Sequence, residues 1–142
     1  MLKRFIFYLF FLMLELFHLV LHLANFFNIY RFGNSQQPVS KYRLYFASDL
    51  LSGIASTIIL RNYYHKSLYF LIIPYIFFHV DANLYFWNKN SILTNKFWDK
   101  IMKISTNKNN DMSFIYIIGV LDEILLRTIF IYLYIKILFL NF

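Results

Sequence analysis

The sequence predicts an all-α integral membrane protein: a four-helix antiparallel transmembrane bundle with a short amphipathic surface helix before the last span. Three observations support this fold class. The chain of 142 residues is 60% hydrophobic and 23% aromatic, which is more apolar than soluble domains of this size. Four apolar runs approach or exceed the roughly 20 residues that cross a bilayer as a helix. Each run carries ionisable residues, which in hydrocarbon must face other helices. The predicted spans are residues 5–27, 42–60, 68–87 and 114–140, with the surface helix at 91–104.

Composition narrows the function classes. The chain has no cysteine, which excludes disulfides, thiolate metal sites and cysteine nucleophiles. Its formal charge is +7. In a membrane protein this excess of lysine and arginine reflects topology and anionic lipid, so no nucleic-acid partner is expected. We therefore expect a single polytopic domain over residues 1–142, in a bacterial inner membrane or an organelle membrane.

The first span contains Glu15, His18 and His22. An ionised carboxylate at the centre of a bilayer costs roughly 2.5–3.5 kcal/mol on insertion scales. The histidines follow Glu15 by one and two helical turns, so all three side chains share one narrow helix face. This helix is predicted to have a lipid side and one polar stripe that meets protein, water or a metal.

The second span also has a single polar face, formed by Asp49, Ser52 and Ser56. Gly53 in the same span is small enough to allow close approach of another helix. The polar stretch that follows, residues 61–66, has room for only a short turn. Spans two and three are therefore predicted to be antiparallel neighbours.

The third span contains Pro74, which should kink the helix or free a carbonyl near its middle. His79 and Asn83 lie one turn apart and share a face. Asp81 points roughly the opposite way if the helix is regular. His79 is thus the residue of this span most suited to meet the histidines of the first.

The longest connection, residues 88–113, contains apolar residues at helical spacing between lysines. This pattern predicts an amphipathic helix on the membrane surface, with Leu93, Phe97 and Ile101 in the acyl boundary and Trp98 at headgroup level.

The fourth span contains Asp122, Glu123 and Arg127. Glu123 and Arg127 are separated by four residues and are predicted to pair. This leaves Asp122 as a carboxylate that could act as a general acid or base.

The polar residues of the four spans are predicted to share one depth. A rise of about 1.5 Å per residue places them in a layer roughly 10 Å thick, nearer the side opposite to the N-terminus. Independent polar residues would scatter in depth, so one shared site is expected. The predicted catalytic residues are Glu15, Asp49 and Asp122; the predicted metal ligands are His18, His22 and His79; the predicted supporting residues are Ser52, Asp81, Asn83, Glu123 and Arg127.

Three imidazoles with an open position suit catalytic zinc, and histidines with several carboxylates suit iron or manganese. The sequence therefore predicts a metal-assisted or acid/base enzyme, such as a hydrolase, that acts on a lipid or isoprenoid-like substrate. The set of donors resembles in kind that of intramembrane zinc amidases acting on ceramides, which have more spans and different spacing.

Two other function classes stay open. One is a non-enzymatic protein that binds haem b between His79 and either His18 or His22, or an accessory subunit of a membrane complex. The other is an interaction protein of the bacteriocin-immunity type, whose function would not require buried histidines at one depth. Membrane lipids are the expected partners in each case, and a homo-oligomer is compatible with all of them.

Overall fold

The computed structural model describes residues 2–26, 39–88, 91–93, 96–98 and 114–140. All regular structure within these residues is helical, which confirms the predicted all-α class. The long helices are α1 (Leu2–Phe26), α2 (Val39–Ile59), α3 (Tyr69–Asn88) and α5 (Phe114–Ile135); a 3-10 turn η1 (Lys66–Leu68) precedes α3, and a π-helical turn η2 (Lys136–Leu140) continues α5. These bounds lie close to those of the four predicted spans.

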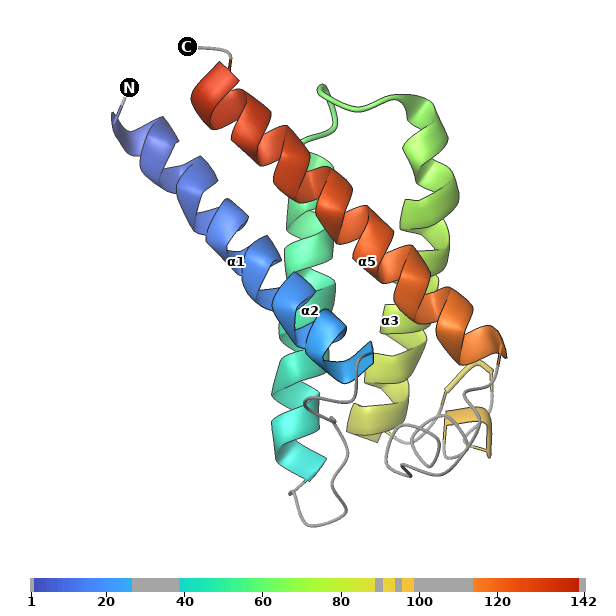
Figure 1. Ribbon diagram of the computed structural model, residues 1–142. Coiled ribbons are helices and arrows are strands. Elements are labelled where there is room, and N and C mark those ends of the chain that lie inside the picture. Colours follow the sequence, from blue (N-terminus) through green and yellow to red (C-terminus); the bar gives the residue numbers. More distant parts are fainter. Residues whose placement is uncertain (1, 27–38, 89–90, 94–95, 99–113, 141–142) are drawn as a thin grey trace.

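The helices form two pairs. Helices α1 and α5 lie side by side and cross in front of α2 and α3, which pack against each other as the predicted antiparallel neighbours (Figure 1). His65 begins the turn into α3, because its Nδ1 accepts a hydrogen bond from the Ser67 amide at 3.2 Å. The two chain termini lie at the same end of the bundle (Figure 1). We call this the terminal end, and the other the opposite end.

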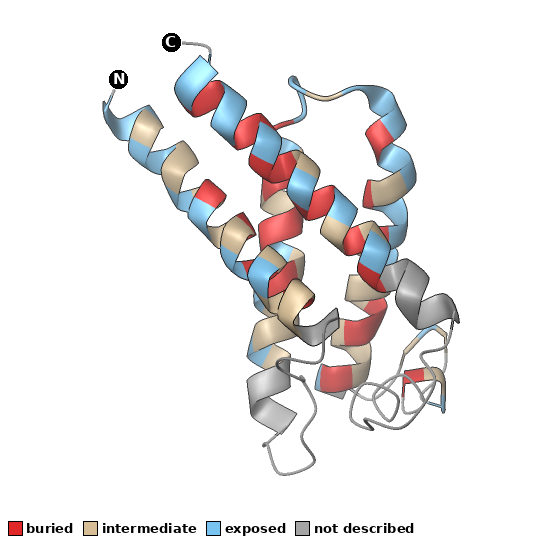
Figure 2. Ribbon diagram, viewed as in Figure 1, coloured by how far each residue is buried: buried red, intermediate tan, exposed pale blue. Residues whose placement is uncertain are grey.

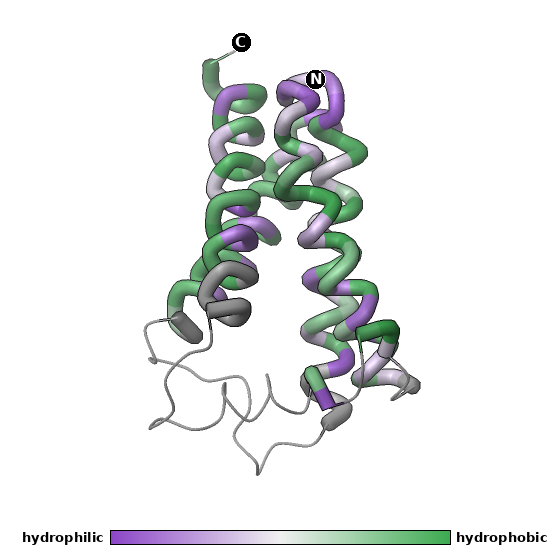
Figure 3. The backbone as a smooth tube through the Cα atoms, turned by 90° about the vertical axis from the view of Figure 1, so that its right-hand side faces the viewer, coloured by the Kyte–Doolittle hydropathy of each residue, from purple (hydrophilic) through white to green (hydrophobic). Residues whose placement is uncertain are grey.

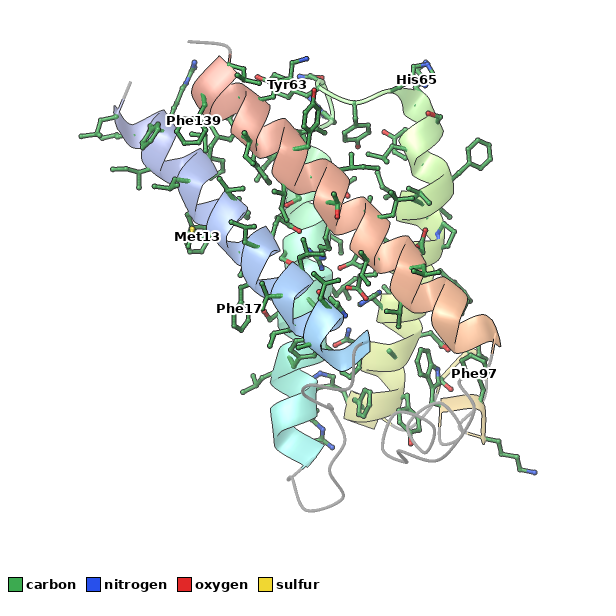
Figure 4. The ribbon with its side chains drawn as sticks, viewed as in Figure 1. Met13, Phe17, Tyr63, His65, Phe97 and Phe139 are labelled. Carbon is green, nitrogen blue, oxygen red and sulfur yellow. The ribbon has the colours of Figure 1, made fainter. Side chains whose placement is uncertain are left out.

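The apolar core lies toward the terminal end. It is built from side chains of all four long helices and η1, including Leu12, Leu60, Leu68, Ile72, Leu126, Phe130 and Tyr134. The inward faces of the helices are buried and the outward faces exposed (Figure 2). The exposed faces carry large apolar side chains, such as Met13 and Phe17, which point away from α1 (Figure 4). Apolar residues cover most of the length of each helix (Figure 3).

Among the described residues, two helical segments are long and apolar enough to cross a membrane, judged by length and composition: Leu2–Ala24 and Lys66–Trp87. Helices α2 and α5 are as long, but α2 is less apolar than the other helices, and α5 carries several charged residues. In α5 these are Asp122, Glu123 and Arg127. Whether such charges exclude a membrane position depends on where their side chains point.

The segment after α3 is described only in part, and it is helical at residues 96–98, within the predicted surface helix. Only residues 91–93 and 96–98 of the predicted 91–104 helix are described, and residues 99–104 lie outside the described part of the chain. Trp98 is buried, and its Nε1 donates to Asp81 Oδ2 at 2.8 Å. Its position at headgroup level stays a prediction. Asp81 also accepts hydrogen bonds from the amides of Ile92 and Leu93. This carboxylate therefore fastens the segment to α3.

Candidate functional site

Arg127 is the centre of a buried polar cluster. Its side chain is 0% exposed. Nη1 donates to Glu15 Oε2 at 2.6 Å and to Ser52 Oγ at 2.8 Å. Nη2 donates to the Tyr75 hydroxyl at 2.6 Å, to the main-chain oxygen of Asp49 at 2.9 Å and to Asp49 Oδ1. One guanidinium on α5 thus bonds to α1, α2 and α3 and ties the four long helices together.

Hydroxyl groups hold Glu15 on its other side. Ser56 Oγ donates to Glu15 Oε1 at 2.5 Å, and the Tyr134 hydroxyl donates to Ser56 Oγ at 3.0 Å. All three residues are fully buried. We call the following set the arginine half of the cluster: Glu15, Ser52, Ser56, Tyr75, Arg127 and Tyr134.

Asp49 connects this half to a second group. Its Oδ1 faces Arg127, while Oδ2 lies 2.8 Å from His79 Nε2 and 3.4 Å from His22 Nε2. Glu123 Oε1 lies 2.7 Å from His22 Nε2 and 3.3 Å from His79 Nε2. We call His22, His79, Glu123 and Asp49 Oδ2 the histidine half. The side chains of His22 and His79 are 9% and 12% exposed, so this half lies nearer the surface than Arg127.

His22, Asp49 and Glu123 each offer one ligand atom, and these three atoms lie within 4.8 Å of one another, close enough to hold one small cation. His79 Nε2 lies against both carboxylate oxygens but is not part of that three-residue group. Bonds of 2.0–2.1 Å to a tetrahedral zinc place neighbouring ligand atoms about 3.3 Å apart. The four carboxylate–imidazole distances given above run from 2.7 to 3.4 Å. Glu123 Oε1 is buried without a hydrogen bond within the described part of the chain, although His22 Nε2 is close to it.

The charge balance of the cluster depends on its imidazoles. With Glu15, Asp49 and Glu123 ionised and both imidazoles neutral, Arg127 balances one of three carboxylates, and two negative charges remain. Uncompensated charges in a protein interior cost several kcal/mol each. One divalent cation in the histidine half would balance the cluster, as would protonation of both imidazoles.

Tyr75 orients His79 and Asp49. The Tyr75 carbonyl can only accept, so His79 Nδ1 donates to it, at 2.9 Å, and Nε2 is turned toward the carboxylates. Metal-ligating histidines commonly donate their second ring nitrogen in this way. The Tyr75 hydroxyl donates to the main-chain oxygen of Asp49 at 2.7 Å. It reaches there because α2 has Gly53 at the crossing, where any Cβ would overlap the tyrosine ring. This confirms the predicted close approach at Gly53.

No relative identifies the chain. No family model matches it, and no curated protein or solved structure matches it either. Its function is therefore argued from the site alone.

The two acidic residues of α5 differ in their contacts. The predicted pairing of Glu123 with Arg127 is confirmed as an ion pair. Glu123 is a carboxylate of the site and lies 3.7 Å from Arg127, whose closer partners are Glu15 and Asp49. Asp122 is half-buried, and the described contacts give it no hydrogen bond or ion pair with the cluster. Consecutive helical residues point about 100° apart, so only one of the two can face inward.

Three other predicted site residues lie beside the cluster. Asp81 holds the segment after α3, on the far side of the helix from His79. Asn83 Nδ2 donates to the carbonyls of Phe46 and His79, at 3.0 and 2.7 Å, and so joins α2 to α3. His18 lies on the Oδ1 side of Asp49, with Nδ1 3.3 Å from that oxygen, and is not part of the histidine half.

Sequence reasoning missed the tyrosines and one serine of the site. Three tyrosines each contact a buried polar group: Tyr75, Tyr134 and Tyr45. The Tyr45 hydroxyl lies 3.1 Å from His22 Nε2. The tyrosines could have been found, because each lies one or two turns from an ionisable residue on the same helix face. Ser48, at 3.3 Å from His18 Nε2, adjoins Asp49 in sequence and gives no such signal.

Proposed function

We propose that all four long helices span a membrane. Of the charged residues of α2 and α5 that would oppose this, Asp49, Glu123 and Arg127 face the buried cluster, while Asp122 is half-buried. Large apolar side chains cover the outward faces instead: Leu44, Leu51 and Ile58 on α2, and Leu121, Leu125, Tyr132 and Ile135 on α5. Ionisable residues inside membrane bundles face the bundle interior and pair with one another in this manner.

In this bundle, the histidine half forms the active site of a small multi-pass membrane enzyme, a hydrolase of a lipid or isoprenoid-like substrate. The observation that carries the proposal is the group of His22, Asp49 and Glu123, whose ligand atoms lie within 4.8 Å of one another, with His79 Nε2 against both carboxylates. Bound there, Zn²⁺, Fe²⁺ or Mn²⁺ would supply Lewis-acid chemistry and an activated water. The two carboxylate oxygens lie against both imidazoles, an arrangement that favours a small cation over haem b.

Three residues outside the metal ligands have separate roles in this proposal: Arg127, Asp122 and Glu15. Arg127 fixes Oδ1 of Asp49, so that Oδ2 stays turned toward the histidines. Asp122 is the half-buried carboxylate outside the ligand set and is the candidate general base. Glu15 bonds to Arg127 and Ser56 and is fully buried, which supports a scaffold role in place of the catalytic role predicted from the sequence.

The test is metal analysis of protein purified in mild detergent without chelator. We expect about one divalent transition-metal ion per chain in the wild type, and its loss in His79→Ala. His65→Ala is the matched control, because His65 is an exposed histidine at the terminal end, far from the cluster (Figure 4). Folded wild-type protein that holds no metal after incubation with Zn²⁺, Fe²⁺ or Mn²⁺ would overturn the metal site. A Soret band in the visible spectrum would move the assignment to haem.

A further inference from the structure

Ser48, His18 and Asp49 form a line of polar contacts at the edge of the cluster. Ser48 Oγ lies 3.3 Å from His18 Nε2, and His18 Nδ1 lies 3.3 Å from Asp49 Oδ1. The serine is exposed, while the histidine and the aspartate are fully buried. This order of groups is that of a serine nucleophile, the imidazole that takes its proton, and the carboxylate that orients the imidazole.

We propose that Ser48 is the nucleophile of a serine hydrolase site, with His18 as its general base and Asp49 as the group that orients His18, acting on esters of long-chain acids. The proposal rests on the proposed function only in placing the bundle in a membrane. It requires no metal, because it uses Oδ1 of Asp49 whereas the histidine half uses Oδ2.

The two serines of the polar face of α2 already bond to other groups of the cluster. Ser52 Oγ donates to the Asp49 carbonyl and accepts from Arg127, and Ser56 Oγ donates to Glu15 and accepts from Tyr134. Both are buried. Ser48 differs from them because it is exposed and has an imidazole nitrogen as its partner.

Two aromatic rings hold His18 in place. The Phe17 ring packs edge-on against the imidazole at 5.5 Å, and the Tyr45 ring lies 5.8 Å from it. His18 Nδ1 lies within ion-pair distance of Asp49 but is not aligned as a hydrogen bond in this state. Catalytic hydrogen bonds are often longer in free enzymes and tighten when substrate binds.

The surroundings of Ser48 select an apolar substrate. Leu44 and Leu51 precede and follow Ser48 by about one turn on the same face of α2, and both are well exposed. On α1, Phe17 and Val20 near His18 are also exposed. A carbonyl that reaches the Ser48 hydroxyl must therefore be carried on a chain that tolerates apolar surroundings, which describes an acyl lipid.

The reaction balances as hydrolysis of an ester. Ser48 Oγ bonds to the carbonyl carbon as its proton passes to His18 Nε2, and the ester C–O bond breaks as that proton moves to the leaving alcohol. Water then attacks the acyl carbon and gives a proton to His18 Nε2. The Ser48 C–O bond breaks, the acid leaves, and the proton returns to Ser48 Oγ. The sum is ester plus water giving acid plus alcohol, and no other reactant is needed.

The test is covalent labelling with a long-chain fluorophosphonate, read by intact mass and peptide mapping of the full chain in mild detergent. We expect one adduct, on Ser48, that is abolished in Ser48→Ala and slowed at least 100-fold in His18→Gln, since removal of a triad base costs several powers of ten in rate. Ser67→Ala removes an exposed serine outside the cluster and should label as the wild type does. Thermal unfolding of each variant shows that it is folded.

Three results would overturn the proposal: no adduct on folded wild-type protein, an adduct on another residue, or an undiminished rate in folded His18→Gln. A chelator separates the two proposals. Labelling that persists after chelation supports the serine site whether or not the metal site exists. Labelling that depends on a bound metal would overturn the serine site as a centre of its own and leave the proposed metal function standing.

Discussion

The two halves of the buried cluster share Asp49 and yet are built differently. In the arginine half, Arg127, Glu15 and Ser56 are fully buried and joined by hydrogen bonds of 2.5–3.0 Å that connect the four long helices. In the histidine half, the side chains of His79 and His22 are 12% and 9% exposed, and Glu123 Oε1 has no hydrogen bond within the described part of the chain. Satisfied hydrogen bonds in a dry interior are what a scaffold requires. Converging donors near the surface are what a binding site requires, so the same layer of polar residues serves two purposes.

Arg127→Met should have the largest effect on stability. It removes the only arginine or lysine that contacts Glu15 and Asp49 among the described residues, and leaves both carboxylates buried. Breaking a buried ion pair from one side costs about 3–5 kcal/mol. The expected outcome is loss of a monodisperse folded peak in detergent, measured by size-exclusion chromatography and thermal unfolding. Arg61→Met, at an exposed arginine of the α2–α3 turn, should behave as the wild type. A folded, metal-loaded Arg127→Met protein would contradict the scaffold role.

Glu123→Gln should produce the reverse pattern. The substitution keeps the shape of the side chain but removes the charge that faces both imidazoles. Metal affinity should fall by more than about 100-fold, because even residues behind the ligands commonly change affinity by about 10–100-fold. A competition titration against a chromogenic chelator measures this. Asp122→Asn, one residue earlier and outside the ligand set, should stay within about threefold of the wild type. Equal losses in both variants would remove the distinction between these two carboxylates.

The layer of polar residues could be predicted from the sequence. Its division into an arginine half and a histidine half could not. The one-turn spacing of Glu15, His18 and His22 and the shared face of Asp49, Ser52 and Ser56 follow from helix geometry. Such spacing fixes which side of a helix a residue occupies. It does not fix how a long side chain crosses to other helices, and Arg127 reaches three of them.

Asp81 shows a second limit of the sequence argument. It shares the predicted depth of the site residues, but it lies on another face of α3 and bonds to Trp98. Its depth along the helix therefore suggested a place in the cluster. Its direction around the helix axis differs from that of His79 and points it away from the cluster. Glu123 and Asp122 give a second example. Their depths along α5 are almost equal, and only their directions around the helix axis differ.

Gly53→Ala tests whether the two halves are coupled through Tyr75. The added methyl group would overlap the tyrosine ring, and this ring carries the hydroxyl that contacts both Asp49 and Arg127. Overpacking of this kind costs about 1–3 kcal/mol, and we expect metal affinity to weaken by about tenfold as His79 and Asp49 shift. Tyr75→Phe removes the hydroxyl without the overlap. If the coupling runs through the hydroxyl, Gly53→Ala should add little to the loss of affinity in Tyr75→Phe; full additivity would contradict it.

Asp81→Asn should have the smallest effect and should leave both halves intact. Asp81 accepts hydrogen bonds from three donors, namely the Ile92 and Leu93 amides and Trp98 Nε1. An asparagine offers one acceptor oxygen and turns an NH₂ group toward at least one of these donors. A buried donor without an acceptor costs about 1–3 kcal/mol, and here the loss is local to the segment that Asp81 fastens. In a Trp87→Phe background, which leaves Trp98 as the only tryptophan, its fluorescence should shift to longer wavelength. Metal affinity and the unfolding midpoint of the bundle should change little. A tenfold loss of metal affinity would show that Asp81 contributes to the histidine half. In that case depth along α3 would predict its role better than its direction around the helix axis.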